Sequence, residues 1–144
     1  MIDVFIKIKG TQGLDGDTDV IEFATAGTLD IKDGEYTLCY NEGEMLGVKT
    51  VKTTLTVKSS DTVIMERSGD MSSRLVIEKG VRNNCFYNTP HGSLMIGIFG
   101  ESVKSSLSML GGRVEMNYTI DSNLQTVSRN MVEITVEVAK EENN

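Results

Sequence analysis

The chain has 144 residues, of which 39% are hydrophobic and 24% are charged, and its formal net charge at pH 7 is −7. This length suits one domain whose core needs no disulfide or metal to hold it. The acidic balance, the lack of a Lys/Arg cluster and the absence of tryptophan argue against nucleic acids and anionic membranes as partners.

Cysteine usage and the first residues bear on the cellular compartment. The chain has two cysteines, Cys39 and Cys85. Residues 1–4 lack the basic and then apolar pattern of a secretion signal, and no stretch approaches the roughly 18 apolar residues of a spanning helix. We therefore expect a cytoplasmic protein with both thiols reduced and packed as small hydrophobic side chains. A structural disulfide is the less favoured alternative.

Apolar residues alternate with polar ones from the start of the chain. Isoleucine or valine occupies positions 2, 4, 6 and 8, which predicts a half-buried strand. The alternation returns over 21–31, where Gly27 predicts a bend or bulge in a long strand that curls round a barrel. Asp33-Gly34 then predicts a tight hairpin turn. The single proline, against roughly seven at average usage, also favours strand ladders.

The rest of the chain repeats this pattern at hairpin spacing. The segment 102–110 is ambiguous, because Val103, Leu107 and Leu110 would share one helical face, but its serines favour a strand closed by a Gly111-Gly112 turn. About ten strand segments and no convincing helix predict an all-β sandwich or barrel. We expect one domain over 1–140 and a frayed polar tail over 141–144. The further strand segments are 36–40, 51–57, 63–65, 75–77, 83–88, 94–98, 114–120 and 132–138.

Candidate catalytic and metal-binding residues are few. His91 is the one histidine; it lies in a turn, and no sequence neighbour would orient it as a catalytic base. One histidine and two distant cysteines do not make a common zinc site. The acidic segment 15–19 resembles a calcium loop, but Val20 and Ala26 stand where that loop needs glycine and glutamate. We expect a solvated loop there, with weak cation binding as the alternative, and neither a metal nor a cofactor.

Arg67 is the most informative charged residue. It continues the alternation of Val63 and Met65, so its side chain could point into the barrel. A buried arginine needs a partner, which would be a carboxylate, of Glu42 or Glu115, or an anionic ligand. Four methionines on predicted strands are expected to fill the core, with an adaptable pocket as the alternative. They are Met65, Met95, Met109 and Met116.

Several short motifs occur in a fixed order along the chain. They are Tyr40-x-Glu42, Thr53-Thr54-Leu55, Arg67-x-Gly69, Tyr87-x-Thr89-Pro90-x-Gly92, Gly111-Gly112 and Tyr118. Together they resemble the YwiB-like family, an uncharacterised bacterial domain with a calycin-type β-barrel. The resemblance implies an antiparallel, up-and-down, lipocalin-like barrel of about eight strands. It implies no activity, and a fold by itself assigns none.

The function we favour from the sequence is small-molecule binding. A barrel of eight strands has an interior that side chains can fill or that can hold one small ligand. We expect an apolar or amphipathic ligand, and Arg67 would meet any charged group on it. A cavity of about 300 Å³ or more would favour this function. The candidate binding residues are Met65, Arg67, Tyr87, His91 and Tyr118.

Two other functions stay open. One is a solid barrel with a structural or protein-interaction role, and it predicts an interior filled by large side chains. The other, less favoured, is an enzyme, which would need His91 to meet Glu42 or Asp70 inside the barrel mouth. The large side chains expected to fill a solid barrel are Phe23, Tyr36, Leu55 and Ile134.

Overall fold

The computed structural model describes residues 1–14, 16–41, 51–59, 61–69, 72–89 and 92–139. These residues form ten β-strands and no helix, so they contain no helix that could cross a membrane. The expected frayed tail at 141–144 lies outside the described residues. The strands are β1 (Ile2–Leu14), β2 (Asp17–Lys32), β3 (Glu35–Asn41), β4 (Val51–Ser59), β5 (Thr62–Gly69), β6 (Ser72–Glu78), β7 (Arg82–Thr89), β8 (Gly92–Ser105), β9 (Gly111–Ser122) and β10 (Gln125–Val138).

The strands form one antiparallel meander that closes into a barrel. Each strand pairs with the next along the chain, and β10 pairs with β1. This confirms the all-β, up-and-down barrel predicted from the sequence. The number of strands is ten rather than about eight, because the stretch from β4 to β7 forms four short strands of seven to nine residues.

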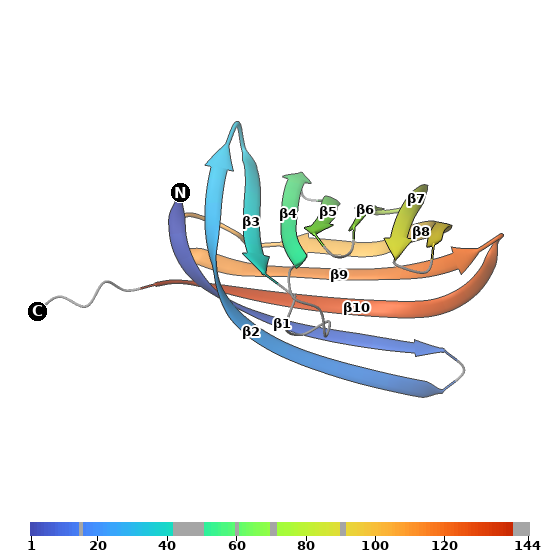
Figure 1. The fold of residues 1–144 in the computed structure, drawn as a ribbon. Helices are drawn as coiled ribbons and strands as arrows, with labels where there is room; N and C mark the ends of the chain where they lie inside the picture. Colours follow the sequence, from blue (N-terminus) through green and yellow to red (C-terminus); the bar gives the residue numbers. More distant parts are fainter. Residues whose placement is uncertain (15, 42–50, 60, 70–71, 90–91, 140–144) are drawn as a thin grey trace, which may run out of the picture.

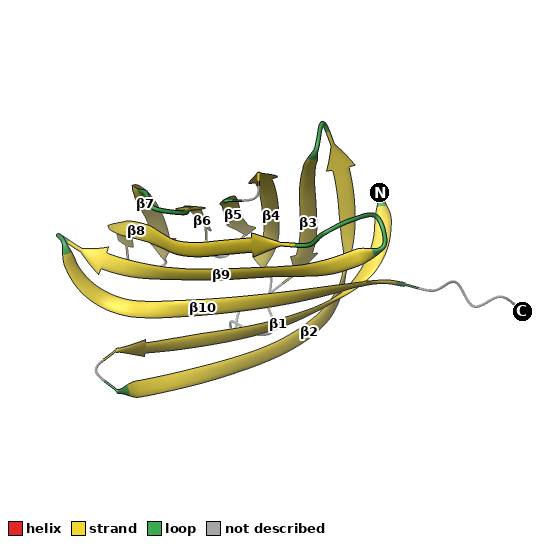
Figure 2. Ribbon diagram, turned by 180° about the vertical axis from the view of Figure 1, so that it is seen from behind, coloured by secondary structure: helices red, strands yellow, loops and turns green. Residues whose placement is uncertain are grey.

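The strands differ greatly in length, and this gives the barrel an uneven outline. The strands β1, β2, β8, β9 and β10 have 12 to 16 residues each. Figures 1 and 2 show the β1–β2 and β9–β10 hairpins extending to one side, well beyond the short strands β4 to β6. One end of the barrel therefore has walls of unequal height.

The other end of the barrel, which we call the packed end, contains the hydrophobic core. A row of inward side chains crosses five paired strands there, and each member is at least 96% buried. Removing this much apolar surface from water is the main stabilising contribution to the fold. The row consists of Leu29, Leu38, Leu55, Met65 and Leu75, and Met65 lies at its border with the open end.

The structure tests two sequence predictions for the part of β2 at the packed end, a bend or bulge at Gly27 and a hairpin turn at Asp33-Gly34. A Cβ on Gly27 would lie 2.7 Å from the Cδ1 atom of Ile6 and 2.5 Å from the carbonyl oxygen of Cys39. The ladder with β1 runs through Gly27 without a register shift, so this glycine permits close packing rather than a bulge. Asp33 and Gly34 have φ of 53° and 79°, which confirms the predicted tight hairpin turn.

The segment 102–110 is a strand only in its first part. β8 ends at Ser105, and the chain then forms a loop before β9, so the prediction of a strand through Met109 is wrong. Serine hydroxyls favour the loop, because Ser108 Oγ accepts a hydrogen bond from the Leu110 N–H at 3.1 Å. Gly112 has φ of 136° and would bring a Cβ within 2.2 Å of the Ser106 carbonyl oxygen.

The four methionines expected in the core divide into two pairs. Met65 and Met116 are buried, as predicted. Met95 is 56% exposed and Met109 is 63% exposed, so for these two the prediction is wrong. The reason is their position: Met95 pairs with Phe86 on the outer face of the sheet, and Met109 lies in the loop after β8.

The ladder between β6 and β7 is the weakest seam of the barrel. Among the described residues these strands pair at two positions, one of which joins Ser73 to Tyr87. Where the ladder opens, the backbone N–H of Val76 donates to the Sγ atom of Cys85 at 3.5 Å. Ser73 Oγ and Asn83 Nδ2 lie on the two sides of this seam and are buried without a hydrogen-bond partner among the described residues.

Candidate functional site

A cavity of about 200 Å³ opens at the uneven end of the barrel, which we call the mouth. Its inner surface combines apolar side chains with a few polar groups, as ligand pockets generally do. Six strands contribute to it, namely β1, β2, β3, β5, β9 and β10. The residues that matter most for its chemistry are Ile8, Ile21, Tyr40, Met65, Arg67 and Tyr118.

Strand register explains why these residues share one space. On one wall, Gly10 of β1 lies between Ile21 of β2 and Val132 of β10, and all three face inward. On the other wall, Tyr40 and Arg67 occupy the same inward row, one strand on each side of Thr53. Side chains alternate between the faces of a strand, so each wall presents every second residue to the cavity.

Two observations show that the mouth is hollow. A Cβ built on Gly10 meets no atom within 4 Å, although this glycine points into the barrel. Ile21 also faces inward, yet 54% of its surface is exposed. At the packed end the inward Gly27 has no such space, because the Ile6 side chain occupies it. The barrel is therefore solid at one end and open at the other.

The sequence led us to expect either a ligand cavity of about 300 Å³ or more or a filled barrel. The volume of this cavity is intermediate between the two. About 200 Å³ is less than the 300 Å³ that would favour a ligand of ordinary size. Leu55 and Ile134 are fully buried, whereas Phe23 and Tyr36 are partly buried and pack against the core. The solid half thus matches the packed-barrel expectation, and the mouth keeps room for a small ligand.

Three of the five predicted binding residues meet at the mouth. Met65, Arg67 and Tyr118 line the cavity together, from β5 and β9. The register places Tyr87 of β7 in the same row as Arg67, through its pairing with Ser73. His91 lies outside the described residues, as do Glu42 and Asp70, its expected partners in an enzyme.

Of the two carboxylates considered as partners of Arg67, Glu115 is wrong, and Glu42 lies outside the described residues. Glu115 lies on the outer face of β9, where its carboxylate is 3.6 Å from the Arg113 guanidinium. Arg113 also contacts Glu133 at 3.1 Å on the neighbouring strand. Arg67 faces the interior, so the barrel wall separates it from these charges.

Part of the site was not predicted from the sequence. Ile8, Ile21 and Asn130 line the mouth but were not expected to bind anything. Ile8 and Ile21 showed the alternation of core residues, and nothing in that pattern tells a covered inward position from an uncovered one. Gly10 was the available signal, since a glycine within an alternating strand can mark a close approach or an empty space.

Two other depressions are larger than the mouth but lie at other places on the barrel. One of about 540 Å³ sits beside the tip of the β1–β2 hairpin and is lined by both Asn117 and Tyr118. Consecutive strand residues face opposite ways, so this space wraps round the ends of the strands rather than entering the barrel. Another of about 440 Å³ is bordered by Lys7, Lys9 and Glu22 of the outer face. Each borders only part of the inward set, Tyr118 and Asn130 in the first and Ile8 in the second, whereas the mouth also brings in Tyr40, Met65 and Arg67.

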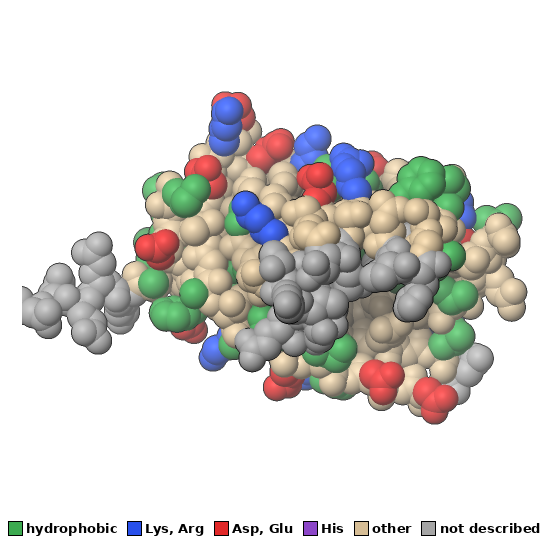
Figure 3. Space-filling view, viewed as in Figure 1, with side chains coloured by type: hydrophobic (Ala, Val, Ile, Leu, Met, Phe, Trp, Pro, Cys, Tyr) green, Lys and Arg blue, Asp and Glu red, His purple; other side chains and the backbone are tan. Residues whose placement is uncertain are grey.

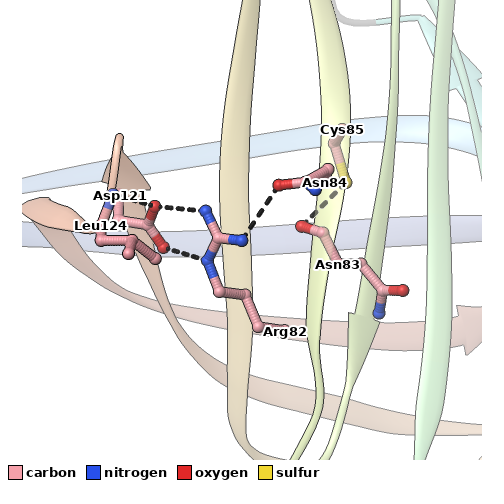
Figure 4. A network of polar contacts seen from close by, with 6 residues as sticks. All are labelled: Arg82, Asn83, Asn84, Cys85, Asp121 and Leu124. Carbon is pink, nitrogen blue, oxygen red and sulfur yellow. Dashed lines mark hydrogen bonds and ion pairs between the residues drawn. The ribbon is translucent and has the colours of Figure 1, made fainter.

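A polar cluster holds the extended end of β9, on the outer face (Figure 4). Arg82 of β7 binds Asp121 of β9 through two hydrogen bonds of 2.8 and 2.7 Å, and it also donates to Asn84 at 3.0 Å. The guanidinium crosses β8 at Gly97, where a Cβ would come within 2.2 Å of it. Asp121 also accepts the Leu124 N–H of the β9–β10 turn at 3.1 Å.

The charges of this cluster stabilise each other. The hydrogen bonds from Arg82 lower the pKa of the Asp121 carboxyl, burial opposes this, and the Leu124 N–H lowers it further. The hydrogen bonds to Asp121 raise the pKa of Arg82. Four hydrogen bonds engage the Arg82 guanidinium and both Asp121 carboxylate oxygens within the protein, so we assign this cluster a structural role at the β9–β10 hairpin.

Within the described ranges, no group of three His, Cys, Asp or Glu side chains is placed to hold a metal ion. Asp17 and Asp19 of the acidic segment belong to β2 rather than to a loop, and Asp15 lies outside the described residues. Cys39 and Cys85 are free thiols.

Comparisons with known proteins agree with this architecture. Residues 6–134 match the family described as domain of unknown function DUF1934. A relative from Bacillus subtilis, named uncharacterized beta-barrel protein YwiB, is 29% identical over 115 residues, which cover 80% of this chain and 79% of the relative. The crystal structure of the ywiB protein from Bacillus subtilis superposes with a TM-score of 0.85 at 26% identity, over 96% of this chain and 93% of that one. These descriptions name no ligand and no reaction.

Proposed function

Because this chain belongs to the DUF1934 family, whose function is unknown, we propose from its structure that the barrel binds one small amphipathic molecule in its mouth. The family match also confirms the resemblance to YwiB-like proteins seen in the sequence. The observation that carries the proposal is the empty space in front of Gly10, an inward position that a core would normally fill.

The dimensions and lining of the mouth describe the ligand. An apolar protein cavity of about 150 Å³ accommodates benzene, so about 200 Å³ suits one ring with a short substituent. Ile8, Ile21 and Met65 supply apolar contacts, and Arg67 and Asn130 supply hydrogen-bond donors near them. An amphipathic molecule would satisfy both parts of this lining. The ligand contacts of Met65, Arg67 and Tyr118 are part of this proposal, and a cytoplasmic location is consistent with the free thiols.

A protein-interaction role is the second candidate, and one surface feature favours it. Figure 3 shows charged side chains of both signs scattered over one face, with an apolar group gathered over β7 and β8. On these strands Phe86 and Met95 pair on the outer face and are 58% and 56% exposed. A contiguous apolar patch on an outer face is typical of a contact surface. This role and ligand binding use different faces and can be tested separately.

The binding proposal is tested with a neutral probe of matching size. Phenylacetamide has one ring and one amide, and its binding to the unmodified protein is measured by calorimetry. The blocking variant is Gly10→Val, which places methyl groups in the space that the ligand would occupy. The matched control is Ala24→Val, a change of similar size on the outward face of β2.

We expect saturable, one-to-one binding to the unmodified protein and to Ala24→Val. Gly10→Val should weaken it at least tenfold while its unfolding temperature stays the same or rises, since valine favours strands more than glycine does. Equal binding to all three proteins would place the probe elsewhere. No saturable binding up to the solubility limit of the probe would contradict the proposal.

A further inference from the structure

We propose that β2 takes up an extended, basic segment of a partner protein as an added strand, along the edge that β3 leaves uncovered. This inference goes beyond the proposed function, because the partner is a protein chain and the contact is the backbone edge of β2 rather than the cavity of the mouth. It is carried by strand pairing, by exposed apolar side chains along the edge and by the charge of the edge.

The edge is the part of β2 that has a neighbouring strand on one side only. β1 pairs with β2 from Leu29 to Asp17, whereas β3 pairs with it only from Lys32 to Gly27. Among the described residues, no strand pairs with the other side of 17–26. Figures 1 and 2 show this stretch as the outermost strand of the extended hairpin, with β1 on one side of it. Such uncovered edges are where an extended peptide can add to a sheet.

Hairpin geometry identifies the backbone groups that face the uncovered side. Lys32 and Glu35 flank the two-residue turn between β2 and β3, so they form a hydrogen-bonded pair across these strands. The N–H of Ile31 points away from β3 and donates to a side-chain oxygen of the preceding residue. The ladders of β2 have no register shift, so every even-numbered residue of 18–26 points its N–H and C=O toward the uncovered side.

Apolar side chains are exposed on both faces of this edge. Val20 and Ile21 point to opposite faces of the strand, and each is 54% exposed. Natural proteins commonly protect an uncovered edge with lysine, proline or a bulge. Residues 17–26 contain neither lysine nor proline, and their ladder with β1 is unbroken. Two exposed β-branched residues on an unbroken edge suit a partner strand better than they suit solvent.

The charge of the edge selects the partner. Asp17, Asp19 and Glu22 are exposed, and residues 17–26 include no basic side chain. Lys9 of β1 lies opposite Glu22, but within the described residues no ion pair joins it to these carboxylates. A second copy would bring the same carboxylates to the edge of a chain that already carries −7. Opposite charges on neighbouring strands attract, so a strand with lysine or arginine at the facing positions is favoured.

A peptide matched to the edge residue by residue tests the inference on the unmodified protein. Its sequence is Val-Lys-Val-Val-Lys-Thr-Lys, and in the antiparallel direction it runs from the position opposite Phe23 to the position opposite Asp17. It places lysine opposite each carboxylate of the edge and valine opposite each apolar side chain. We expect saturable, one-to-one binding by calorimetry at low salt, where charge attraction is least screened.

Two methylated forms of the peptide distinguish strand addition from attraction of charge alone. N-methyl groups opposite Thr18, Val20 and Glu22 remove the donors that face β2, so they should weaken binding about tenfold or more. N-methyl groups opposite Asp19 and Ile21 lie on the far side of the peptide and should leave binding unchanged. Equal affinities of the two forms, or no saturable binding of the parent peptide, would overturn the inference. Equal binding of a peptide with glutamate in place of each lysine would overturn the basic character of the partner.

Variants of β2 then locate the contact. Val20→Pro removes one N–H from the uncovered side, where an edge strand tolerates proline, and should weaken peptide binding about threefold to tenfold. Val20→Thr is the matched control, because it keeps both the N–H and the β-branched shape, and it should bind as the unmodified protein does. Full affinity in Val20→Pro would place the peptide elsewhere.

Amide hydrogen exchange gives a second measure that does not depend on the folding of a variant. The parent peptide should slow exchange of the even-numbered amides of 18–26 in the unmodified protein, and no such protection would overturn the inference. Sedimentation of the unmodified protein without peptide tests the other occupant. A dimer that Val20→Pro dissociates would assign the edge to a second copy and would also overturn the inference.

Discussion

The two ends of this barrel are built from the same alternation of apolar and polar residues, yet one is filled and the other is open. Two inward glycines show the difference. At the packed end, Gly27 is in contact with the Ile6 side chain and the backbone of β3, whereas at the mouth Gly10 faces space. Strand length explains this contrast. β1 and β2 continue past the short strands opposite them, so their last inward residues have no facing partner.

Alternation therefore specifies which face of a strand points inward, but not whether that face is covered. In the packed half every inward side chain has neighbours across the barrel, and the row from Leu29 to Leu75 is closed. In the mouth the same kind of side chain, Ile21, remains half exposed. A cavity in this fold thus arises from a mismatch in strand length rather than from a special motif.

Two inward isoleucines should differ most in what their removal costs in stability. Ile134 is fully buried at the packed end and Ile21 lies in the mouth. Ile134→Ala should lower the free energy of unfolding by about 2–5 kcal/mol, the usual cost of a cavity in a core. Ile21→Ala should cost about 1 kcal/mol or less, since its side chain is already in contact with solvent. Urea unfolding measures both, and equal losses would remove the distinction between the two ends.

The next effect comes from adding a methyl group to each glycine. Gly27→Ala should destabilise the protein by about 1–3 kcal/mol, because the new Cβ would overlap Ile6 and the Cys39 carbonyl. Gly10→Ala should be neutral or stabilise by up to about 1 kcal/mol, since it reduces the entropy of the unfolded chain without a clash. Thermal unfolding of the two variants is the measurement. A destabilised Gly10→Ala would show that the mouth is filled.

A smaller loss of stability is expected where an ion pair, rather than apolar packing, holds the extended end of the barrel. The β9–β10 hairpin extends beyond the core, and Arg82 and Asp121 fasten it by charge rather than by apolar packing. Because the pKa of Asp121 is lowered in the folded state, its contribution is present above the ordinary carboxyl pKa of about 3.9 and is lost as pH falls through the lowered value.

Asp121→Asn should therefore be less stable than the unmodified protein at pH 7, and the gap should narrow below about pH 4. Urea midpoints at a series of pH values follow it. Ile134→Ala serves as the comparison, because the loss of a core side chain should show no such narrowing. A gap for Asp121→Asn that is the same at pH 7 and pH 3 would contradict the electrostatic origin.

The smallest expected effect concerns the turns at the two ends. Asp33 and Gly34 form the β2–β3 turn, and the φ angles of 53° and 70° at Asn123 and Leu124 form its counterpart at the tip of β9–β10. Leucine is a poor choice for the left-handed region, and Leu124 is 78% exposed. Leu124→Gly should raise stability by up to about 1 kcal/mol, measured by thermal unfolding. A loss instead would mean that Leu124 makes contacts that hold the tip.

Much of the fold could be predicted from the sequence, because strand periodicity and turn residues act locally. The Asp33-Gly34 turn and the burial of Met65 followed from such signals. The outcome for Met95 did not, since its side of the strand depends on the register with β7. The same holds for the site: Arg67 and Met65 were identified from alternation, whereas Ile8 and Ile21 join them through long-range pairing that no local pattern encodes.

The most direct test of a barrel that is solid at one end and hollow at the other is a methyl NMR titration of the unmodified protein with phenylacetamide. We predict saturable shifts for Ile8, Ile21 and Met65, and none for Leu29 of the packed end. Met95, on the outer face, reports surface adsorption and should not saturate. Shifts confined to Met95, or no saturable shift at the mouth, would contradict the account.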